Sequence, residues 1–264
     1  MAAQASRNAV LVDLTKCIGC RSCQVACKVW NGNAGQHTAA SADFTNPPAI
    51  DAKTFTLVRF VEHGTAREPA WSFVKSQCMH CLDPTCASAC PVGALQKSAS
   101  GPVTYASDKC FGCRYCMAAC PFGAIGYEWD KALAPRALKC TFCADRQAEG
   151  LKPACVKACP SGALLFGDRD QLLLEAERRI RKGNGKYVDY VYGKDEAGGT
   201  SWLYVSGVPF DRLGFRMKVP KQPLHALAWA SISKAPAVVG GLAVGLAAIA
   251  AFRNRAASER KGEK

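Results

Sequence analysis

The first ten residues lack the features that would direct the chain out of the cytoplasm by itself. They contain neither a long apolar run nor a pair of arginines, so we find no secretory or twin-arginine signal there. We therefore expect the protein either to stay in the cytoplasm or to be exported with a partner that carries the signal.

Acidic residues are scarce relative to basic ones. The 264 residues include 21 Asp and Glu against 34 Lys and Arg, which gives a formal net charge of +13. A surplus of this size is typical of proteins that bind nucleic acid or a membrane surface. The cysteines change this interpretation.

No cysteine stands outside four sets of four. Sets one and three have the spacing C-x2-C-x2-C-x3-C, and one gap widens to four residues in set two and to eleven in set four. A proline directly follows sets two, three and four, but not set one. The sets are Cys17, Cys20, Cys23 and Cys27; Cys78, Cys81, Cys86 and Cys90; Cys110, Cys113, Cys116 and Cys120; and Cys140, Cys143, Cys155 and Cys159.

This spacing is that of bacterial ferredoxins, whose thiolates hold [4Fe–4S] clusters. Three cysteines in a tight loop bind one cluster, and the fourth points away to a different cluster. Zinc sites more often show two C-x2-C pairs, and disulfide-dense folds are small secreted domains. Sixteen cysteines therefore predict four [4Fe–4S] clusters. Their thiolates and cores together leave a holoprotein charge of about +5, so we expect no nucleic-acid partner.

By this ferredoxin precedent, we expect the fourth cysteine of each set to bind the cluster of a partner set. Adjacent sets two and three, whose Cys-Pro-x-Gly-Ala motifs at 90–94 and 120–124 repeat, are expected to exchange them with each other. Sets one and four would then exchange across the chain. The expected ligands are Cys17, Cys20, Cys23 and Cys159 for cluster 1; Cys78, Cys81, Cys86 and Cys120 for cluster 2; Cys110, Cys113, Cys116 and Cys90 for cluster 3; and Cys140, Cys143, Cys155 and Cys27 for cluster 4.

The expected fold class is α+β, with two nested bacterial-ferredoxin-like modules. The outer module comprises 1–70 and 131–182, the inner module 71–130, and 183–223 form an irregular extension. The residue pattern predicts an amphipathic helix at 168–182, capped by Asp168 or Asp170, and a turn-rich surface loop at 31–54. It predicts strands at 10–13, 55–62, 71–74, 103–105 and 202–206.

The C-terminal segment 224–252 is mostly apolar, and its last 18 residues, 235–252, carry no charge. This length predicts one transmembrane helix, with Trp229 as an interfacial anchor; a buried helix of a soluble core is the alternative. The tail 253–264 has five basic residues against two acidic ones. The positive-inside rule therefore predicts a cytoplasmic tail and a periplasmic cluster domain at the inner membrane.

Several motifs resemble one family, the iron–sulfur (beta) subunits of membrane-bound respiratory formate dehydrogenases. These subunits belong to the four-cluster ferredoxin-type electron-transfer subunits of molybdopterin oxidoreductases. The resemblance covers nearly the whole chain. The motifs are Cys-Ile-Gly-Cys-Arg-Ser-Cys-Gln-Val-Ala-Cys-Lys-Val-Trp-Asn at 17–31, Leu-Val-Arg-Phe at 57–60, Cys-Met-His-Cys at 78–81, Pro-Ala-Cys-Val-Lys-Ala-Cys-Pro at 153–160 and Gly-Gly-Thr-Ser-Trp-Leu-Tyr-Val at 198–205.

The resemblance implies an electron-transfer subunit that is not catalytic on its own. A catalytic alpha subunit with molybdenum or tungsten bound to molybdopterin would oxidise formate. Electrons would pass through clusters 1, 4, 2 and 3, in that order, to a cytochrome b gamma subunit that contacts helix 224–252, and then to quinone. Because Cys113 is retained, the resemblance implies four cubanes rather than a three-iron cluster.

Other assignments remain open from the sequence. A hydrogenase or a dimethyl sulfoxide or sulfur-compound reductase would use an equivalent subunit, and a free-standing polyferredoxin-like carrier is a further alternative. A regulatory iron–sulfur protein that binds nucleic acid rests on basicity alone. His80, Lys139 and Lys157 lie within two residues of predicted ligands and are candidates for tuning the clusters, although packing or surface roles are also open.

Overall fold

The computed structural model describes residues 7–39, 41–65 and 67–262, with side chains as far as Ala251 and at Arg253. Residues 1–6 of the N-terminal stretch and the last two residues of the tail lie outside this description. The chain divides into two units, Met1–Leu224 and His225–Lys264, which are described separately.

A three-stranded sheet forms the centre of the first unit. Strand β1 (Asn8–Asp13) lies between β8 (Leu164–Asp168), which is antiparallel to it, and β9 (Trp202–Val205), which is parallel. The apolar run of β1 is buried on both faces, as a central strand requires. The predicted strands at 10–13 and 202–206 are therefore confirmed, with shifted ends.

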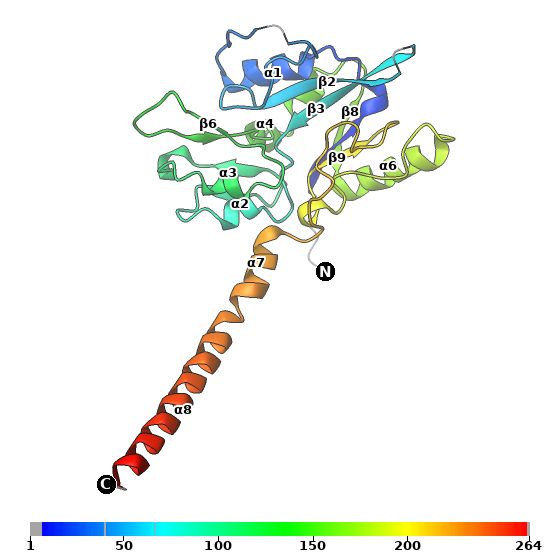
Figure 1. Ribbon diagram of the computed structural model, residues 1–264. Helices are drawn as coiled ribbons and strands as arrows, with labels where there is room; N and C mark the ends of the chain where they lie inside the picture. Colours follow the sequence, from blue (N-terminus) through cyan, green and yellow to red (C-terminus); the bar gives the residue numbers. More distant parts are fainter. Residues whose placement is uncertain (1–6, 40, 66, 263–264) are drawn as a thin grey trace, which may run out of the picture. The chain divides into compact units, whose positions relative to one another are not determined.

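Helix α6 (Arg169–Lys182) covers one face of this sheet (Figure 1). The Asp168 carboxylate accepts hydrogen bonds from the backbone N–H groups of Asp170 and Gln171, which caps the helix. Leu172 and Ala176 are buried against side chains of β1 and β9. The predicted amphipathic helix and the Asp168 cap are confirmed.

The opposite face of the sheet packs on an aromatic core. Trp202 and Tyr204 of β9 lie there with Tyr192, Phe210 and Phe215. Segment 183–223 carries little regular structure beyond β9 and the short 3-10 turn Glu196–Gly198, yet it provides many of the largest buried side chains. Its packing therefore holds the sheet in place.

Three antiparallel hairpins and a series of short helices surround this core. The hairpin of β2 (Thr56–Gly64) and β3 (Pro69–Gln77) extends the pair predicted at 55–62 and 71–74. The smaller hairpins join β4 (Leu95–Lys97) to β5 (Val103–Tyr105), and β6 (Gly126–Tyr127) to β7 (Ala137–Leu138). The helices are α1 (Ser22–Asn31), α2 (Thr85–Ser88), α3 (Tyr115–Ala119), α4 (Ala144–Ala148) and α5 (Ala154–Lys157), with 3-10 turns at Leu14–Lys16 and Ser107–Lys109.

The stretch after α1 is only partly the surface loop that its composition predicts. Its described residues up to β2 form no helix or strand, but Thr45 and Thr54 are buried. The Thr45 hydroxyl accepts a hydrogen bond from the backbone N–H of Phe60 in β2. The stretch therefore packs against the hairpin, a long-range contact that turn propensity does not reveal.

The second unit corrects one prediction. The single helix expected over 224–252 consists of α7 (Leu224–Ile232) and α8 (Ala235–Gly262), which a turn at Ser233 and Lys234 separates. The ring of Pro236 would clash with the carbonyl of Ile232 in a continuous helix, so α7 ends there. Helix α8 also continues through most of the predicted tail, whose side chains beyond Arg253 lie outside the description.

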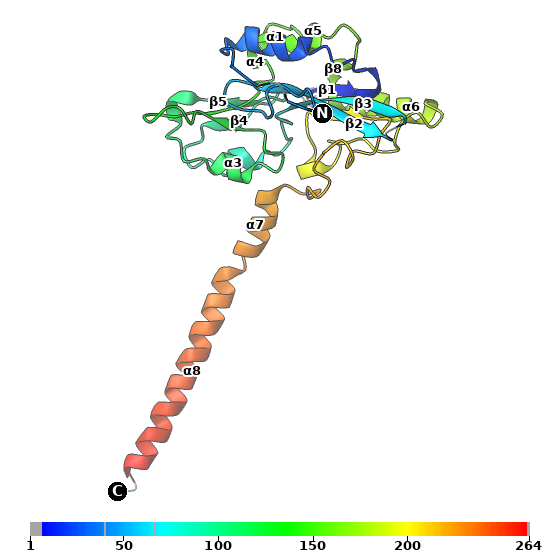
Figure 2. The same ribbon diagram turned by 45° about the horizontal axis from the view of Figure 1, so that its top comes forward.

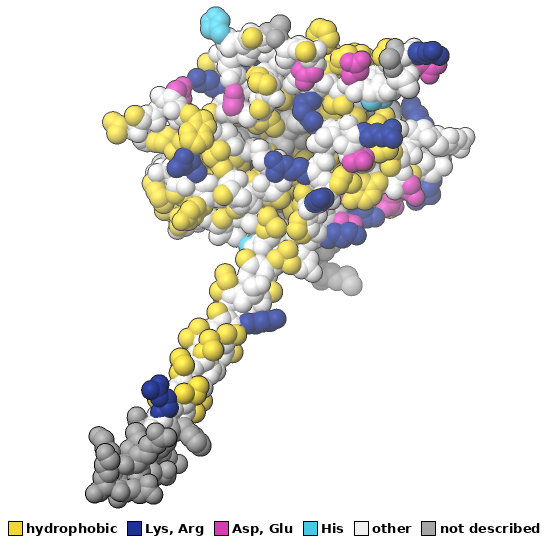
Figure 3. Space-filling model, viewed as in Figure 1, with side chains coloured by type: hydrophobic (Ala, Val, Ile, Leu, Met, Phe, Trp, Pro, Cys, Tyr) yellow, Lys and Arg dark blue, Asp and Glu magenta, His cyan; other side chains and the backbone are white. Residues whose placement is uncertain are grey.

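Leu224–Ala251 is long and apolar enough to cross a membrane, and it is the one such segment in the described chain. Its mean hydropathy is 1.7, and none of it is buried within the structure. Hydrophobic side chains line the visible face of both helices (Figure 3). The segment is a candidate membrane anchor.

Candidate metal centres

The cysteine loops of sets one and three share one backbone form. Gly19 and Gly112 precede the second cysteine with φ of 69° and 80°, a region that glycine enters without strain. Arg21 and Arg114 follow it, also left-handed, as the N-cap residues of α1 and α3. The third cysteine of each set therefore becomes the second residue of a helix.

Sets two and four reach the same arrangement with wider gaps. Pro84 and Pro153 stand directly before α2 and α5, where the fixed φ of proline suits the start of a helix. Cys86 and Cys155 are then the second residues of these helices. The third cysteine of every set thus lies in the first turn of a helix.

Two cavities bring a fourth cysteine to a distant set. One small cavity is lined by Cys17, Cys20, Cys23 and Cys159. Another is lined by Cys90, Cys110, Cys113 and Cys116. Antiparallel pairing of β1 with β8 and of β4 with β5 brings the two parts of each group together. These are the thiols predicted to hold clusters 1 and 3.

The other two fourth cysteines also lie beside a distant set. Burial raises the pKa of Cys143 to about 11, and the negative charges of Cys155 and Cys27 raise it too. Burial likewise raises the pKa of Cys86 to about 12, with Cys120 among the charges that add to it. Cys27 therefore lies near set four and Cys120 near set two, although ligation itself remains a prediction.

We number the four thiol groups 1 to 4 after the clusters that they are predicted to hold, and three apolar clusters connect them. The first apolar cluster contains Cys155 and packs against Cys23 and Cys159, which connects group 4 to group 1. Cys27 and Cys140 pack with Cys78 and Cys120, which joins group 4 to group 2. Cys86 and Cys120 pack with Cys116 and Cys90, which joins group 2 to group 3. The groups are therefore neighbours in the order 1, 4, 2, 3, and Figures 1 and 2 show α1 and α3 at opposite ends of this unit.

Backbone N–H groups point at several of the sulfur atoms. In the repeated Cys-Pro-x-Gly-Ala motif, Ala94 donates to Cys90 Sγ at 3.2 Å and Ala124 to Cys120 Sγ at 3.5 Å. Burial alone would raise the pKa of Cys90, but the N–H groups of Leu95 and Ala94 outweigh it and lower that pKa. These donors favour the thiolate that a metal ligand requires.

The donor set fits iron–sulfur clusters. All sixteen cysteines are free thiols, and burial raises the pKa of Cys23 and Cys86 to about 12. Thiols packed in this way need a cationic core to become thiolates. No three His, Cys, Asp or Glu side chains in the described residues are close enough to hold a single ion; the thiolates of a cubane stand at its corners, farther apart than the ligands of one ion.

The three candidate tuning residues have different surroundings. His80 is fully buried, and its Nδ1 accepts a hydrogen bond of 2.9 Å from the backbone N–H of Val103. Burial, followed by the charge of Lys139, lowers the pKa of His80 well below its ordinary value, so the ring is neutral. Lys139 is also buried, and its ammonium donates to the carbonyls of Val103 and Cys140. Lys157 is exposed, which makes it a surface charge.

Sequence reasoning missed a buried cation beside the thiols, Lys75 on β3, which is 2% exposed. It lines the cavity of group 1 and lies near thiols of group 4. The signal that could have found it is its place in the strand pattern, on the same face as Phe73 and Gln77 and three residues before set two.

Comparison with family models places the cysteines in a known kind of domain. Residues 16–94 and 69–169 each match a family described as a 4Fe–4S dicluster domain. Together the two matches contain all sixteen cysteines.

Three relatives give the similarity over longer stretches. The formate dehydrogenase iron–sulfur subunit of Haemophilus influenzae is 38% identical over 245 residues, which cover 89% of this chain and 77% of the relative. The nitrate-inducible formate dehydrogenase iron–sulfur subunit of Escherichia coli K12 is 40% identical over 200 residues, 75% of this chain and 67% of the relative. The hydrogenase-2 operon protein HybA of Escherichia coli O157:H7 is 34% identical over 239 residues, 77% of this chain and 71% of the relative.

Proposed function

We propose that this chain relays electrons between a catalytic partner and the membrane. The chain belongs to the family of iron–sulfur electron-transfer subunits found in formate dehydrogenases. The partner would be a molybdopterin-containing alpha subunit that oxidises formate. Electrons would pass through four [4Fe–4S] clusters to a membrane cytochrome b subunit and to quinone. The chain itself would perform no substrate chemistry.

The observation that carries this proposal is the row of four thiol groups. In two cavities, three cysteines of one set lie with the fourth cysteine of another, and apolar packing supports the order 1, 4, 2, 3 for the four groups. Single electrons move between clusters that lie close together, so an unbranched row supports a directed path. The same pairing supports an inner module of sets two and three nested in an outer module of sets one and four.

The chain's own residues supply the setting for this chemistry. A [4Fe–4S] cluster, when bound, carries one electron at a time. Burial of ligands such as Cys78, Cys140 and Cys155 keeps water away from the path. The N–H groups of Ala94 and Ala124 donate to ligand sulfur atoms, and such hydrogen bonds stabilise the reduced form of a cluster.

The membrane end of the proposal rests on the apolar segment Leu224–Ala251. A single span would attach the first unit to the membrane and provide a helix for a cytochrome b subunit to contact. The basic tail supports a cytoplasmic C-terminus, which would place the clusters on the periplasmic side of the inner membrane.

A hydrogenase complex is the second candidate, because HybA is similar over most of this chain. The cluster row would then be unchanged, and the catalytic partner would be a nickel-containing subunit that oxidises hydrogen.

Purification from membranes in detergent at native abundance separates the two candidates. We expect a molybdopterin-containing subunit to copurify and formate to reduce an artificial dye. A nickel-containing partner with hydrogen uptake would contradict the formate assignment, whereas purification of the chain alone would contradict its role as a subunit.

A further inference from the structure

Lys75 is a charged side chain enclosed by the fold. Its ammonium donates hydrogen bonds to Gln77 Oε1 at 2.7 Å and to Thr56 Oγ1 at 3.3 Å. It also lies 4.3 Å from the centre of the Trp202 ring. These partners satisfy the hydrogen bonds of the ammonium and hold it in one position, but all of them are neutral.

No carboxylate balances this charge. None of the ion pairs within the described residues involves Lys75. A buried cation without a counter-ion is costly, because burial removes its hydration. Stable burial of Lys75 therefore requires negative charge nearby that comes from something other than Asp or Glu.

Cysteines of two predicted ligand sets lie near Lys75. The lysine lines the cavity of Cys17, Cys20, Cys23 and Cys159. The thiols of Cys155 and Cys140 are also close enough to act on its charge. The lysine therefore stands where thiol groups 1 and 4 approach each other. Four thiolates around a cubane core form a net anion, which supplies the missing counter-charge.

The ionisation of Lys75 agrees with this position. Burial on its own lowers the pKa of Lys75, but the negative charges of Cys155 and Cys23 outweigh it and hold that pKa above its ordinary value. Gln77 is itself fixed by a 2.6 Å hydrogen bond from its Nε2 to the Tyr204 hydroxyl. The ammonium is thus both charged and anchored.

We propose that Lys75 raises the reduction potentials of clusters 1 and 4, the two clusters whose predicted ligands lie near its ammonium. A fixed positive charge stabilises the reduced state of each cluster, since reduction adds negative charge. Clusters 2 and 3 lie farther along the row and are affected less. Lys75 therefore makes clusters 1 and 4 easier to reduce than they would be without its charge. This inference rests on the proposed ligand sets.

The test is a redox titration of the purified complex, monitored by electron paramagnetic resonance, with Lys75→Met and Lys75→Arg. In Lys75→Met we expect two of the four clusters to be reduced about tenfold less favourably, a shift of about 59 mV to lower potential for a one-electron couple. Lys75→Arg keeps the charge and should keep the potentials. Lys16→Met is the matched control, because Lys16 adjoins Cys17 but is exposed, so water and salt screen its charge.

Unchanged potentials in a Lys75→Met complex that retains its iron would overturn the proposal, and so would an equal shift in Lys16→Met. Lys75→Gln keeps a hydrogen-bond donor without the charge. It provides a second neutral variant for the same titration if the methionine variant assembles poorly. If both neutral variants lose iron while Lys75→Arg does not, the ammonium is needed for assembly and the proposal is also wrong. The iron content of the unaltered complex tests the ligand sets independently of Lys75.

Discussion

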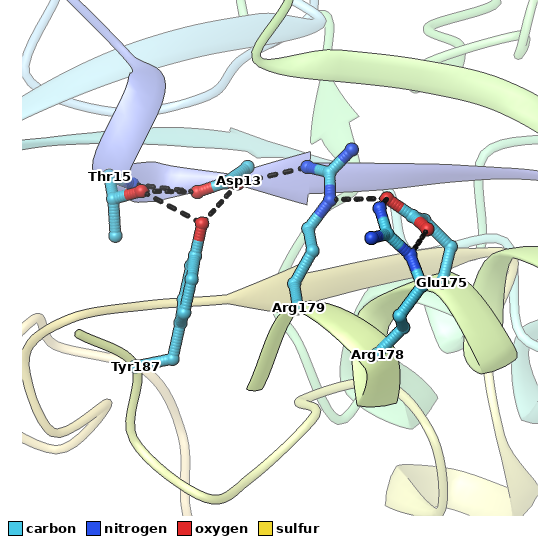
Figure 4. A network of polar contacts seen from close by, with 6 residues as sticks. All are labelled: Asp13, Thr15, Glu175, Arg178, Arg179 and Tyr187. Carbon is cyan, nitrogen blue, oxygen red and sulfur yellow. Dashed lines mark hydrogen bonds and ion pairs between the residues drawn. The ribbon is translucent and has the colours of Figure 1, made fainter. Parts of the chain in front are cut away.

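Arg179 Nη1 lies 2.9 Å from Asp13 Oδ2, and the Asp13 side chain has no exposed surface. Tyr187 also donates to this carboxylate, and Thr15 donates to its other oxygen (Figure 4). Asp13 ends β1 and caps the 3-10 turn that leads to Cys17. The ion pair therefore ties α6 to the strand that delivers the first cysteine of set one.

Removal of Arg179 should destabilise the first unit strongly. We expect Arg179→Met to lower the free energy of unfolding by about 3–5 kcal/mol, because it leaves a buried carboxylate without its cation. Urea titration of the anaerobic protein, followed by loss of cluster absorbance, measures the effect. The neighbouring Arg178 pairs with Glu175 at an exposed position, so Arg178→Met should cost at most about 1 kcal/mol. Equal effects of the two variants would contradict the structural role of Asp13.

Exchange of the fourth cysteines predicts which cluster each substitution alters. Cys27→Ser should change the same paramagnetic signal as Cys140→Ser, because both thiols are predicted ligands of cluster 4. Cys20→Ser should change a different signal, that of cluster 1. If Cys27→Ser and Cys20→Ser altered the same cluster, each set would keep its own fourth cysteine and the exchange would be wrong.

The sequence is sufficient to predict features that rest on local rules. Cysteine spacing leads to the cluster type, and the cap at Asp168 with apolar residues at helical spacing leads to α6. The motif repeated at 90–94 and 120–124 has the same backbone form in both copies, with φ of 62° at Gly93 and 63° at Gly123. Each of these signals lies within a few residues of the feature that it predicts.

Features that depend on long-range packing could not be predicted in this way. The strand pattern puts Lys75 on one face with Phe73 and Gln77, but only its contact with Trp202, far along the chain, shows that it is enclosed. Thr45 is buried because the loop that carries it packs against β2, where the N–H of Phe60 donates to its hydroxyl. Residues 183–223 look irregular, yet aromatic residues drawn from across that stretch form the core. Pro236 indicates the break between α7 and α8, because proline disfavours a continuous helix, but the apolar composition of 224–252 on its own predicts one helix.

The hairpin of β6 and β7 should weaken in acid through Glu128. The Arg136 guanidinium, opposed by burial and helped by Lys131, lowers the pKa of Glu128 from 4.5 to about 2. The ionised form is thus favoured in the folded state, and its stabilisation is full above about pH 4.5 and is lost as the pH falls towards about 2. Amide exchange of Gly126–Leu138 should lose protection as the pH falls below about 4.5. Glu128→Gln should show less amide protection than the unaltered protein at the higher pH, and its protection should change little as the pH falls. An identical pH profile in both proteins would contradict the role of Glu128.

Attachment to the membrane should depend on the apolar surface of α8. Leu242 and Leu246 are exposed in this helix, and an arginine at the centre of a span costs about 2.5–3.5 kcal/mol. We expect the chain carrying Leu242→Arg and Leu246→Arg, expressed without partners, to leave the membrane fraction after carbonate washing and to retain its iron. Leu174→Arg, at an exposed position on α6, should stay with the membrane. A double variant that remained in the membrane would contradict a single C-terminal anchor.

The central claim, a row of four [4Fe–4S] clusters held by sixteen cysteines, is tested most directly by iron and acid-labile sulfide analysis of the anaerobically purified protein. The account predicts about 16 iron and about 16 sulfide per chain. A preparation with about 8 of each, or with zinc in place of iron, would contradict it.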